Sequence, residues 1–365
     1  MTRATEQAAG ARHKTQPLTY GAIEYLRTID DYHGVPRGTA IFGRQTVYGY
    51  PSIGRVLTLE PGLQQHFAHP FWAEEKVNGY NTRILRVGDA VLALTRGGFV
   101  CPFTTDRVTD FIDTRVFEDH PDLVICAEVA GPGNPYLESS PPFIGDDVRF
   151  YVFDFMRINQ RPRLAAEDKY ALIEDYGLPA VTRYGRFTAK DTKALLEIFE
   201  TLNREGREGL VFKEDAADGH AAKHVTAASA LSDIAATAAT LNDLPPEYFT
   251  NRILRLVLYL REQGEHPTRD LERALGAAFL ESLDATLAQY EREKKVFHSF
   301  RCRFHDRHNA EAMIAHLKMA GGRQINISRR GLEADGADWI LTFDRNYPAI
   351  NGLLSSVLHG DLIYD

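Results

Sequence analysis

The sequence predicts an α+β fold, with most strands in the middle of the chain and a helical section after them. Residues 71–226 contain short apolar runs, rich in β-branched and aromatic residues and bounded by Gly, Pro and polar residues, which is typical of strands. Residues 250–292 place apolar side chains at the spacing of amphipathic helices. Residues 294–365 show a strand, helix, strand, strand, helix pattern, which predicts a small α+β unit.

These changes along the chain predict five segments. They are a flexible tail (1–17), an N-terminal unit (18–65), a strand-rich domain (66–230), a helical section (231–293) and a C-terminal α+β unit (294–365). With 365 residues, 44% of them hydrophobic and 25% charged, the chain has ordinary globular composition and room for about two or three domains.

The elements of the first two units follow from local patterns. The apolar spacing of residues 23–29 predicts a helix, and the aromatics, Gly and Pro of 43–61 predict short strands and turns. The strand-rich domain is predicted to contain, in order, strands 71–75, 82–87 and 91–95, a helix at 111–117, strands 123–130 and 149–156, helices 166–176 and 189–203, and strands 209–213 and 221–225.

The rest of the chain begins with a change of composition. Residues 226–244 are rich in Ala and Thr, and the pair Pro245-Pro246 predicts a break. One helix is predicted through Ile253, Leu256, Val257 and Leu260, and one or two more through Leu271, Leu275, Leu283 and Leu287. The C-terminal unit is predicted as strand 296–304, helix 310–320, strands 324–328 and 339–343, helix 349–358 and a last strand at 362–364.

Composition excludes several classes of protein. No apolar run approaches the roughly 20 residues of a membrane span, and the polar first twenty residues lack a signal-peptide core, so a cytoplasmic protein is expected. The net charge of -8 predicts that any nucleic-acid site is a local groove rather than a broad basic surface. Cys101, Cys126 and Cys302 form no CxxC pair, which argues against a disulfide scaffold or a zinc site and favours buried small side chains.

The candidate nucleophile is Lys76, between two predicted strands in the stretch 75–81. Gly79 follows where the backbone must turn or let a ligand approach, so Lys76 is expected to point into a cleft between sheets. A free lysine has a pKa near 10.4, and only about one in 2,500 is neutral at pH 7, so attack needs neighbouring cations or a metal to lower that pKa. Lys213 and Lys223 supply such cations if the chain folds back on Lys76. The alternative for each is an ordinary surface lysine.

Two acids stand out in the same region. Glu128 lies inside an apolar strand, where a carboxylate is costly unless it is paired or hydrogen-bonded, and it is expected either to accept ribose hydroxyls or to form a structural ion pair with an arginine. Glu208 precedes the strand at 209–213 and suits a magnesium ligand near phosphates, or simply a turn acid.

Two further side chains complete the candidate site. Phe153, in a strand of alternating aromatics, can stack on a purine, although aromatics in such strands more often belong to the core. Arg96, at a strand end before two glycines, can reach a phosphate or a terminal ribose.

In this order, these motifs resemble those of the covalent nucleotidyltransferases, which include ATP-dependent DNA and RNA ligases and mRNA capping enzymes. The matching stretches are Lys76 to Asn81 (a KxxG motif), Thr95 to Gly98, Ala127 to Val129, Val152 to Phe155, Glu208 to Lys213 and Ala222 to His224. Asn78 and Asn81 are closest to RNA ligases, since most DNA ligases and capping enzymes have Asp and Arg there. The whole arrangement is most similar to the archaeal homodimeric ATP-dependent RNA ligases.

The resemblance implies a two-sheet, ATP-grasp-like nucleotidyltransferase core and a role for each site residue. Lys76 would attack the α-phosphorus of ATP and hold AMP, with Mg2+ or Mn2+ assisted by Glu208. The nucleotide would contact Glu75, Asn78, Gly79 and Asn81, stack on Phe153, and bind through Glu128 (ribose), Arg96, Lys213 and Lys223 (phosphates). AMP would pass to an RNA 5′-phosphate, and a 3′-hydroxyl would displace it.

One departure and three alternatives remain. Many relatives carry two lysines separated by one residue in the last motif, but here the positions two residues before and after Lys223 are Ala221 and Val225, so only one lysine is present. A DNA ligase or a GTP-dependent capping enzyme usually appends an oligonucleotide-binding barrel, whereas 230–320 has helical patterns. A non-catalytic RNA-binding relative is the third alternative. Arg301, Arg303, Arg329 and Arg330 extend an RNA groove or form a solvated face.

A homodimer is expected from the helices at 250–292 and from the resemblance. Their apolar stripes can equally pack within one chain.

Overall fold

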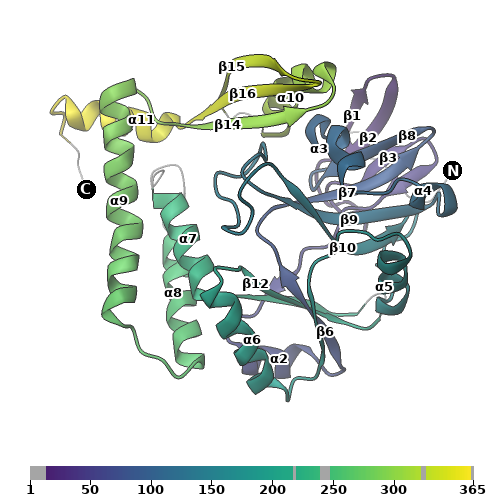
Figure 1. Ribbon diagram of the computed structural model, residues 1–365, viewed down its shortest axis with the longest axis horizontal. Helices are drawn as coiled ribbons and strands as arrows, with labels where there is room; N and C mark the ends of the chain where they lie inside the picture. The colour runs from purple at the N-terminus through teal and green to yellow at the C-terminus, as the bar shows by residue number, and fades with distance from the viewer. Residues whose placement is uncertain (1–13, 217–218, 239–246, 322–325, 363–365) are drawn as a thin grey trace.

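The computed structural model describes residues 14–216, 219–238, 247–321 and 326–362, which form four sheets and several helices. The long helices α7 (Ala227–Ala238), α8 (Glu247–Glu262) and α9 (Arg269–Glu293) lie together at one side of the core (Figure 1). The N-terminal sheet has the strand order β1 (Thr15–Tyr20), β2 (Ile23–Thr28), β3 (Ala40–Phe42), β4 (Gln45–Val47). The C-terminal sheet has the order β14 (Phe297–Phe304), β16 (Asp338–Asn346), β15 (Asn326–Asp335). The two sheets of the core lie between these units in the sequence, and the predicted α+β class is confirmed.

The core consists of two sheets that share one continuous stretch of chain. The first has the order β10 (Arg149–Arg157), β9 (Leu123–Ala130), β7 (Tyr80–Val87), β8 (Ala90–Thr95). The second has the order β11 (Arg183–Phe187), β6 (Phe71–Lys76), β12 (Gly209–Glu214), β13 (Ala221–Val225), β5 (Gly54–Arg55). Because β6 belongs to one sheet and β7 to the other, residues 77–79 cross between the sheets, and Lys76 stands at that crossing.

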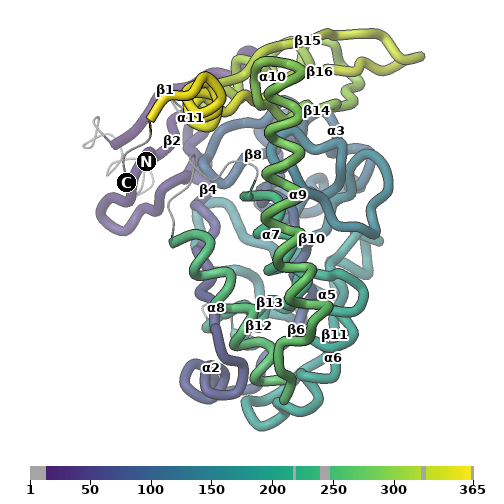
Figure 2. Tube along the Cα trace, turned by 90° about the vertical axis from the view of Figure 1, so that its left-hand side faces the viewer, coloured from purple at the N-terminus to yellow at the C-terminus, as the bar shows by residue number. Residues whose placement is uncertain are grey.

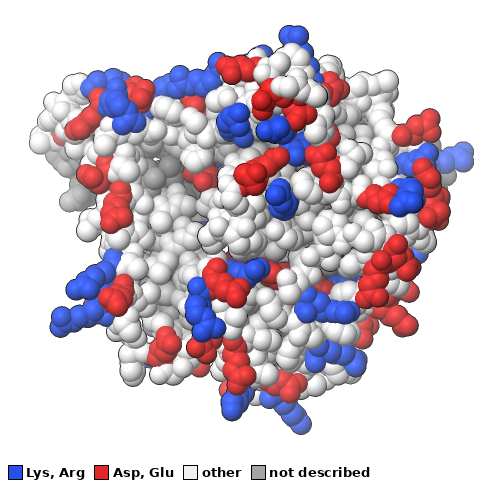
Figure 3. Space-filling model, in the orientation of Figure 1, with Lys and Arg blue, Asp and Glu red and all other residues white. Residues whose placement is uncertain are grey.

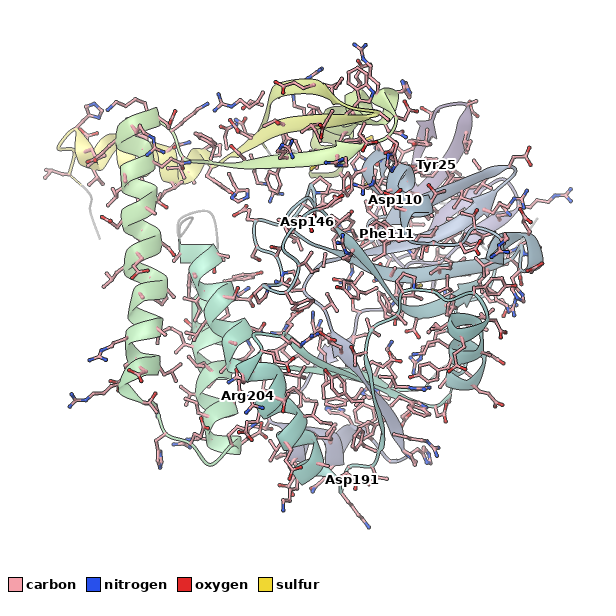
Figure 4. All side chains as sticks on the ribbon, in the orientation of Figure 1. Tyr25, Asp110, Phe111, Asp146, Asp191 and Arg204 are labelled. Carbon is pink, nitrogen blue, oxygen red and sulfur yellow. The ribbon has the colours of Figure 1, made fainter. Side chains whose placement is uncertain are left out.

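Helices follow and precede the strands of these sheets. Those of the core are α2 (Leu59–His66), α3 (Pro102–Arg107), α4 (Val116–Asp119), α5 (Ala166–Asp175) and α6 (Thr192–Arg204). The later ones are α7 (Ala227–Ala238), α8 (Glu247–Glu262), α9 (Arg269–Glu293), α10 (Arg307–Gly321) and α11 (Pro348–Leu358). Asp191 and Arg204 mark the two ends of α6 (Figure 4). No helix in the part of the chain that the structure describes is long and apolar enough to cross a membrane.

Three apolar clusters hold the layers together. One face of the β10–β9–β7–β8 sheet packs against the C-terminal unit, with the rings of Phe103 and Phe304 5.3 Å apart. Its other face packs against the N-terminal sheet, where Tyr25 stacks on Phe42 at 4.9 Å. The second core sheet packs against α2, α6, α7 and α8. The N-terminal and C-terminal units are therefore fixed to one core sheet.

Two predicted helices are wrong. Residues 23–29 form strand β2, because Ile, Tyr and Thr favour strands and Tyr25 packs into the sheet cluster, so the apolar spacing also fits a period of two. Residues 111–117 are mostly turn, with a 3-10 turn at Val108–Asp110 before them and α4 after them. The sequence pattern missed α3, which begins after Cys101 with Pro102 in its first turn.

The other elements match their predictions within a few residues. The site strands β6, β7, β9, β12 and β13 are confirmed, as is the strand, helix, strand, strand, helix order of the C-terminal unit. Residues 15–17, predicted to belong to the flexible tail, form the start of β1. The predicted break at 245–246 and most of the predicted strand at 362–364 lie outside the described residues. The three cysteines are free and buried, as expected.

Candidate active site

Lys76 is the last residue of β6 and opens onto a cavity of about 650 Å³ between the two core sheets. Gly79 allows the crossing, because a Cβ there would lie 2.4 Å from the Val129 carbonyl oxygen and 2.8 Å from Glu128 Cγ. The cavity brings together most of the predicted site: Glu75, Lys76, Gly79, Asn81, Arg96, Glu128, Phe153, Lys213 and Lys223. Asn78 and Glu208 line a small adjoining hollow that also contains Lys76.

Lys76 forms an ion pair with Glu208, with its Nζ 2.7 Å from the carboxylate. Both side chains are mostly buried, and β12, which begins at Gly209, pairs with β6 so that Gly209 lies opposite Lys76. Lys223 comes from the neighbouring strand β13, and burial together with the charges of Lys76 and Arg55 lowers the pKa of Lys223. The fold therefore places Lys223 close to Lys76, as the order of the motifs predicts.

Glu128 lies in β9 opposite Asn81 of β7. Burial raises the pKa of Glu128 to about 7, although Lys76 and the Gly79 N–H, which donates to the carboxylate, oppose that rise. Within the described residues, Glu128 forms no ion pair with an arginine, so the structural alternative is not what holds it. Asn81 has its Oδ1 buried without a hydrogen-bond partner. A ligand with hydroxyl or amino donors would satisfy both groups.

The raised pKa of Glu128 has a measurable effect on stability. Because the folded protein keeps this proton to a higher pH than the unfolded chain, the free energy of unfolding should fall as pH rises from 4.5 to about 7. The fall should be at most about 3.5 kcal/mol, from ~1.4 kcal/mol per pKa unit over about 2.5 units. Glu128→Gln cannot ionise and should flatten this part of the profile in urea unfolding. Identical profiles for the two proteins would contradict the assignment.

Phe153 lies at a β-bulge, since the pairing of β10 with β9 shifts between Val152 and Asp154. A bulge turns a side chain away from the regular alternation. Val152 and Phe155 are buried in the core, whereas Phe153 packs against the N-terminal apolar cluster and also lines the cavity. Its ring makes a T-shaped contact with Tyr50, and Lys213 Nζ lies 5.2 Å from its ring centroid. This placement suits stacking on a purine, and that role stays a prediction.

Lys213 lies in a buried charge cluster that the motifs did not reveal. This charge cluster comprises Glu74, Asp154, Lys169 and Lys213, all of them at most 4% exposed. Lys213 Nζ lies 2.8 Å from Glu74 and 3.0 Å from Asp154 and donates to the Phe153 carbonyl, while Lys169 pairs with Glu74. Two carboxylates thus neutralise Lys213, and its predicted contact with phosphates stays untested. Glu74 and Asp154, like Glu128, are acids inside apolar strands, which is the signal that could have found them.

Arg96 lies in a tight loop braced by the N-terminal unit. Gly98 has φ +80°, and its Cβ would lie 2.6 Å from the Gly38 carbonyl oxygen. Arg27 donates to the Gly97 carbonyl at 2.8 Å, and the guanidinium of Arg96 donates to Ser52 Oγ at 2.7 Å. The buried Arg83 of β7 links both units by donating to the carbonyls of Gly38, Tyr48 and Thr95.

Glu75 forms hydrogen bonds through both its side chain and its backbone. Its carboxylate accepts from Arg207 Nη1 at 2.6 Å, and its backbone N–H donates to the Thr182 carbonyl. Both the carboxylate and the backbone N–H of Glu75 therefore have partners within the protein, and its predicted contact with a nucleotide stays a prediction.

Two family models together match almost the whole chain from residue 69 onward. Residues 69–225 match the family model for RNA ligase, and residues 236–361 match the model for the ligase Pab1020 C-terminal region. An uncharacterized protein of Methanocaldococcus jannaschii is 30% identical over 292 residues, which cover 77% of this chain and 73% of that protein.

Solved structures agree over the full length. An archaeal ATP-dependent RNA ligase is 29% identical, with a TM-score of 0.89 over 98% of this chain and 96% of that one. A structure from Aquifex aeolicus, provisionally named an ATP-dependent DNA ligase, is 47% identical, with a TM-score of 0.93 over 99% of this chain and 100% of that one.

Proposed function

This chain belongs to the RNA ligase family, alongside archaeal ATP-dependent members, and from that membership we propose that it joins 5′-phosphate and 3′-hydroxyl ends of RNA with consumption of ATP. The observation that carries the proposal is Lys76 at the crossing between two sheets, beside Glu208 and facing a cavity that can hold a nucleotide.

The proposed reaction proceeds in three steps: transfer of AMP to Lys76, transfer of AMP to the RNA, and joining of the RNA ends. The neutral Lys76 Nζ attacks the α-phosphorus of ATP, an N–P bond forms, and pyrophosphate leaves. An oxygen of the RNA 5′-phosphate then attacks the same phosphorus, the N–P bond breaks, and adenylated RNA forms. Finally the 3′-hydroxyl attacks the 5′-phosphorus and releases AMP. Lys223 and Arg96 stabilise the phosphate charge in each transfer.

A divalent cation, Mg2+ or Mn2+, fits this site only as a companion of the phosphates. The described residues hold no group of three or more acidic, His or Cys ligands, and Glu208 is the carboxylate nearest to Lys76. Mg2+ commonly takes one or two carboxylates together with phosphate oxygens and water. Glu208 would hold it, and the cation would neutralise charge on the triphosphate.

The alternatives differ in nucleotide and in substrate. A capping enzyme would use GTP and usually carries an oligonucleotide-binding barrel, whereas the section after the core is formed by helices α7, α8 and α9. The provisional name of the Aquifex aeolicus structure favours DNA, and the family match favours RNA.

The nucleotide is tested by incubating the protein with α-phosphate-labelled ATP or GTP and a magnesium salt. We expect that ATP, but not GTP, leaves label on the protein that survives a denaturing gel. Labelling by GTP and not by ATP would favour a capping enzyme.

We also propose that the protein forms a homodimer through the outer face of the helical section. α9 lies along the outside of the molecule, with α7 between it and the sheets (Figures 1 and 2). Leu254 and Val257 of α8 and Leu280 of α9 are exposed, and Leu280 is 71% exposed. Large apolar side chains that stay exposed on helices at the surface are candidates for an interaction site.

The dimer predicts the effect of one substitution. Leu280→Asp should shift the protein from dimer to monomer in sedimentation at micromolar concentration, because a charge would be buried at the interface. Leu57→Asp, at an exposed leucine outside the helical section, should leave the mass unchanged. A monomeric parent protein, or a dimer that tolerates Leu280→Asp, would contradict the proposal.

A further inference from the structure

The two ends of the cavity differ in charge. At one end lies the charge cluster of Glu74, Asp154, Lys169 and Lys213, in which two acids balance two lysines. Phe153 lies on this cluster, so this end suits the uncharged base of a nucleotide. Elsewhere, on the face drawn in Figure 3, acidic and basic side chains are intermixed without a large area of one sign.

The rest of the cavity wall carries four cations that form no ion pair in the described residues, although Glu128 lies near Arg96 and Glu208 near Lys223. In the described part of the chain, no carboxylate pairs with Arg27, Arg37, Arg96 or Lys223, all of which line the cavity. Lys223 lies close enough to Lys76 and Arg96 for their charges to lower its pKa. Arg27 and Arg37 form a second pair, since burial and then the charge of Arg37 lower the pKa of Arg27. One group of cations therefore surrounds the nucleophile, and another lies on the N-terminal unit.

Arg27 is held in place, and Arg37 is free to reach a ligand. The Arg27 guanidinium lies 3.8 Å from the centroid of Phe99, and it donates to Gln16 Oε1 at 2.9 Å and to the Gly97 carbonyl. Arg37 is exposed, and its backbone N–H is tied to Asp31 at 2.7 Å, which fixes where its side chain begins. Two adjacent guanidinium groups, one pre-organised, match the oxygens of a terminal phosphate.

We propose that Arg37 and Arg27 form a subsite for the 5′-terminal phosphate of the RNA, which rests on the proposed function. The RNA 5′-phosphate must enter the cavity next to the lysyl-AMP, where its oxygen forms a bond to the AMP phosphorus as the bond to Lys76 breaks. The cations near Lys76 serve the AMP phosphate, so a second phosphate needs a second set of charges. Arg27 and Arg37 of the N-terminal unit supply these charges. The N-terminal unit therefore acts in the transfer of AMP from Lys76 to the RNA.

The test compares Arg37→Glu in the full chain with Arg44→Glu, an exposed arginine of the same unit that does not line the cavity. Three rates are measured: lysyl-AMP formation from labelled ATP, its reversal by pyrophosphate, and its discharge to 5′-phosphorylated RNA. Arg37→Glu should slow only the discharge to RNA, by at least about tenfold, as expected for loss of a charged phosphate contact with charge reversal. Arg44→Glu should leave all three rates unchanged.

RNA binding gives an independent readout. The parent protein should prefer 5′-phosphate over 5′-hydroxyl RNA as a competitor, and Arg37→Gln should abolish that preference. It should also reduce the slope of log affinity against log salt by about 0.7, the value for one phosphate contact on a single strand.

Each outcome decides the assignment. Normal discharge to RNA by Arg37→Glu would overturn it, and an equal loss in the pyrophosphate reaction would assign the subsite to the pyrophosphate of ATP instead. A parent protein that never forms lysyl-AMP would refute the proposed function and not this subsite alone.

Discussion

Replacing Lys76 with alanine is expected to abolish covalent attachment of AMP, by at least about a thousandfold, because Lys76 Nζ is the atom proposed to form the bond to phosphorus. Lys76 lies at the crossing between the sheets with its Nζ 2.7 Å from Glu208, and it belongs to none of the apolar clusters, so the substitution removes a mostly buried side chain but no core packing. The measurement is retention of label from α-phosphate-labelled ATP on a denaturing gel.

Two companion variants separate the nucleophile from its charge. Lys76→Arg keeps a cation beside Glu208 but, with its far higher pKa, cannot become a neutral amine, so it should also remain unlabelled. Lys190→Ala, at an exposed lysine far along the chain from the site strands, should label normally. Label on Lys76→Ala would show that another residue is the nucleophile.

Replacing Glu74 with glutamine is expected to lower the free energy of unfolding by about 3–5 kcal/mol, the usual cost of leaving a buried charge unpaired. Glu74 is 1% exposed and pairs with both Lys169 and Lys213, and Tyr170 donates to it at 2.7 Å. Burial opposes its ionisation, but Lys213 and Lys169 lower the pKa of Glu74 to about 2. Its contribution to stability should therefore be full above pH 4.5 and should be lost as pH falls toward about 2.

Urea unfolding near neutral pH measures this loss. Glu60→Gln, at an exposed acid of α2, should change stability by less than about 0.5 kcal/mol. Adding Lys169→Met to Glu74→Gln should recover part of the loss, because one buried lysine then needs no partner. A loss below about 1 kcal/mol for Glu74→Gln would mean that the charge cluster does not stabilise the fold.

The strands of the site could be predicted because each has an unambiguous local pattern. Strand 123–130 is apolar except for Glu128, and 209–213 and 221–225 are short runs between turns, so the structure reproduces them nearly to the residue. The helix predicted at 23–29 failed because tertiary packing of Tyr25 decides between two periods that both fit the sequence.

Site residues that belong to a sequence motif could be predicted. Site residues that only the folded structure brings together were missed. Lys76, Glu128 and Lys223 meet in the cavity as the motif order predicts. Glu74, Asp154 and Lys169 come from three separate elements, and no spacing along the chain reveals that two acids and two lysines meet under Phe153. Arg27 and Arg37 were missed because only the packing of the N-terminal sheet places them on the cavity wall.

The most direct test of the central claim is a comparison of RNA and DNA end joining. The protein is incubated with ATP, a magnesium salt and a single strand of RNA, or of DNA of the same sequence, that carries a labelled 5′-phosphate and a 3′-hydroxyl. A denaturing gel then separates the joined product from the substrate and from the adenylated strand. We expect ATP-dependent joined product to form from RNA, and we expect Lys76→Ala to form none. Efficient joining of DNA with none of RNA, or joining that survives Lys76→Ala, would contradict the proposed function.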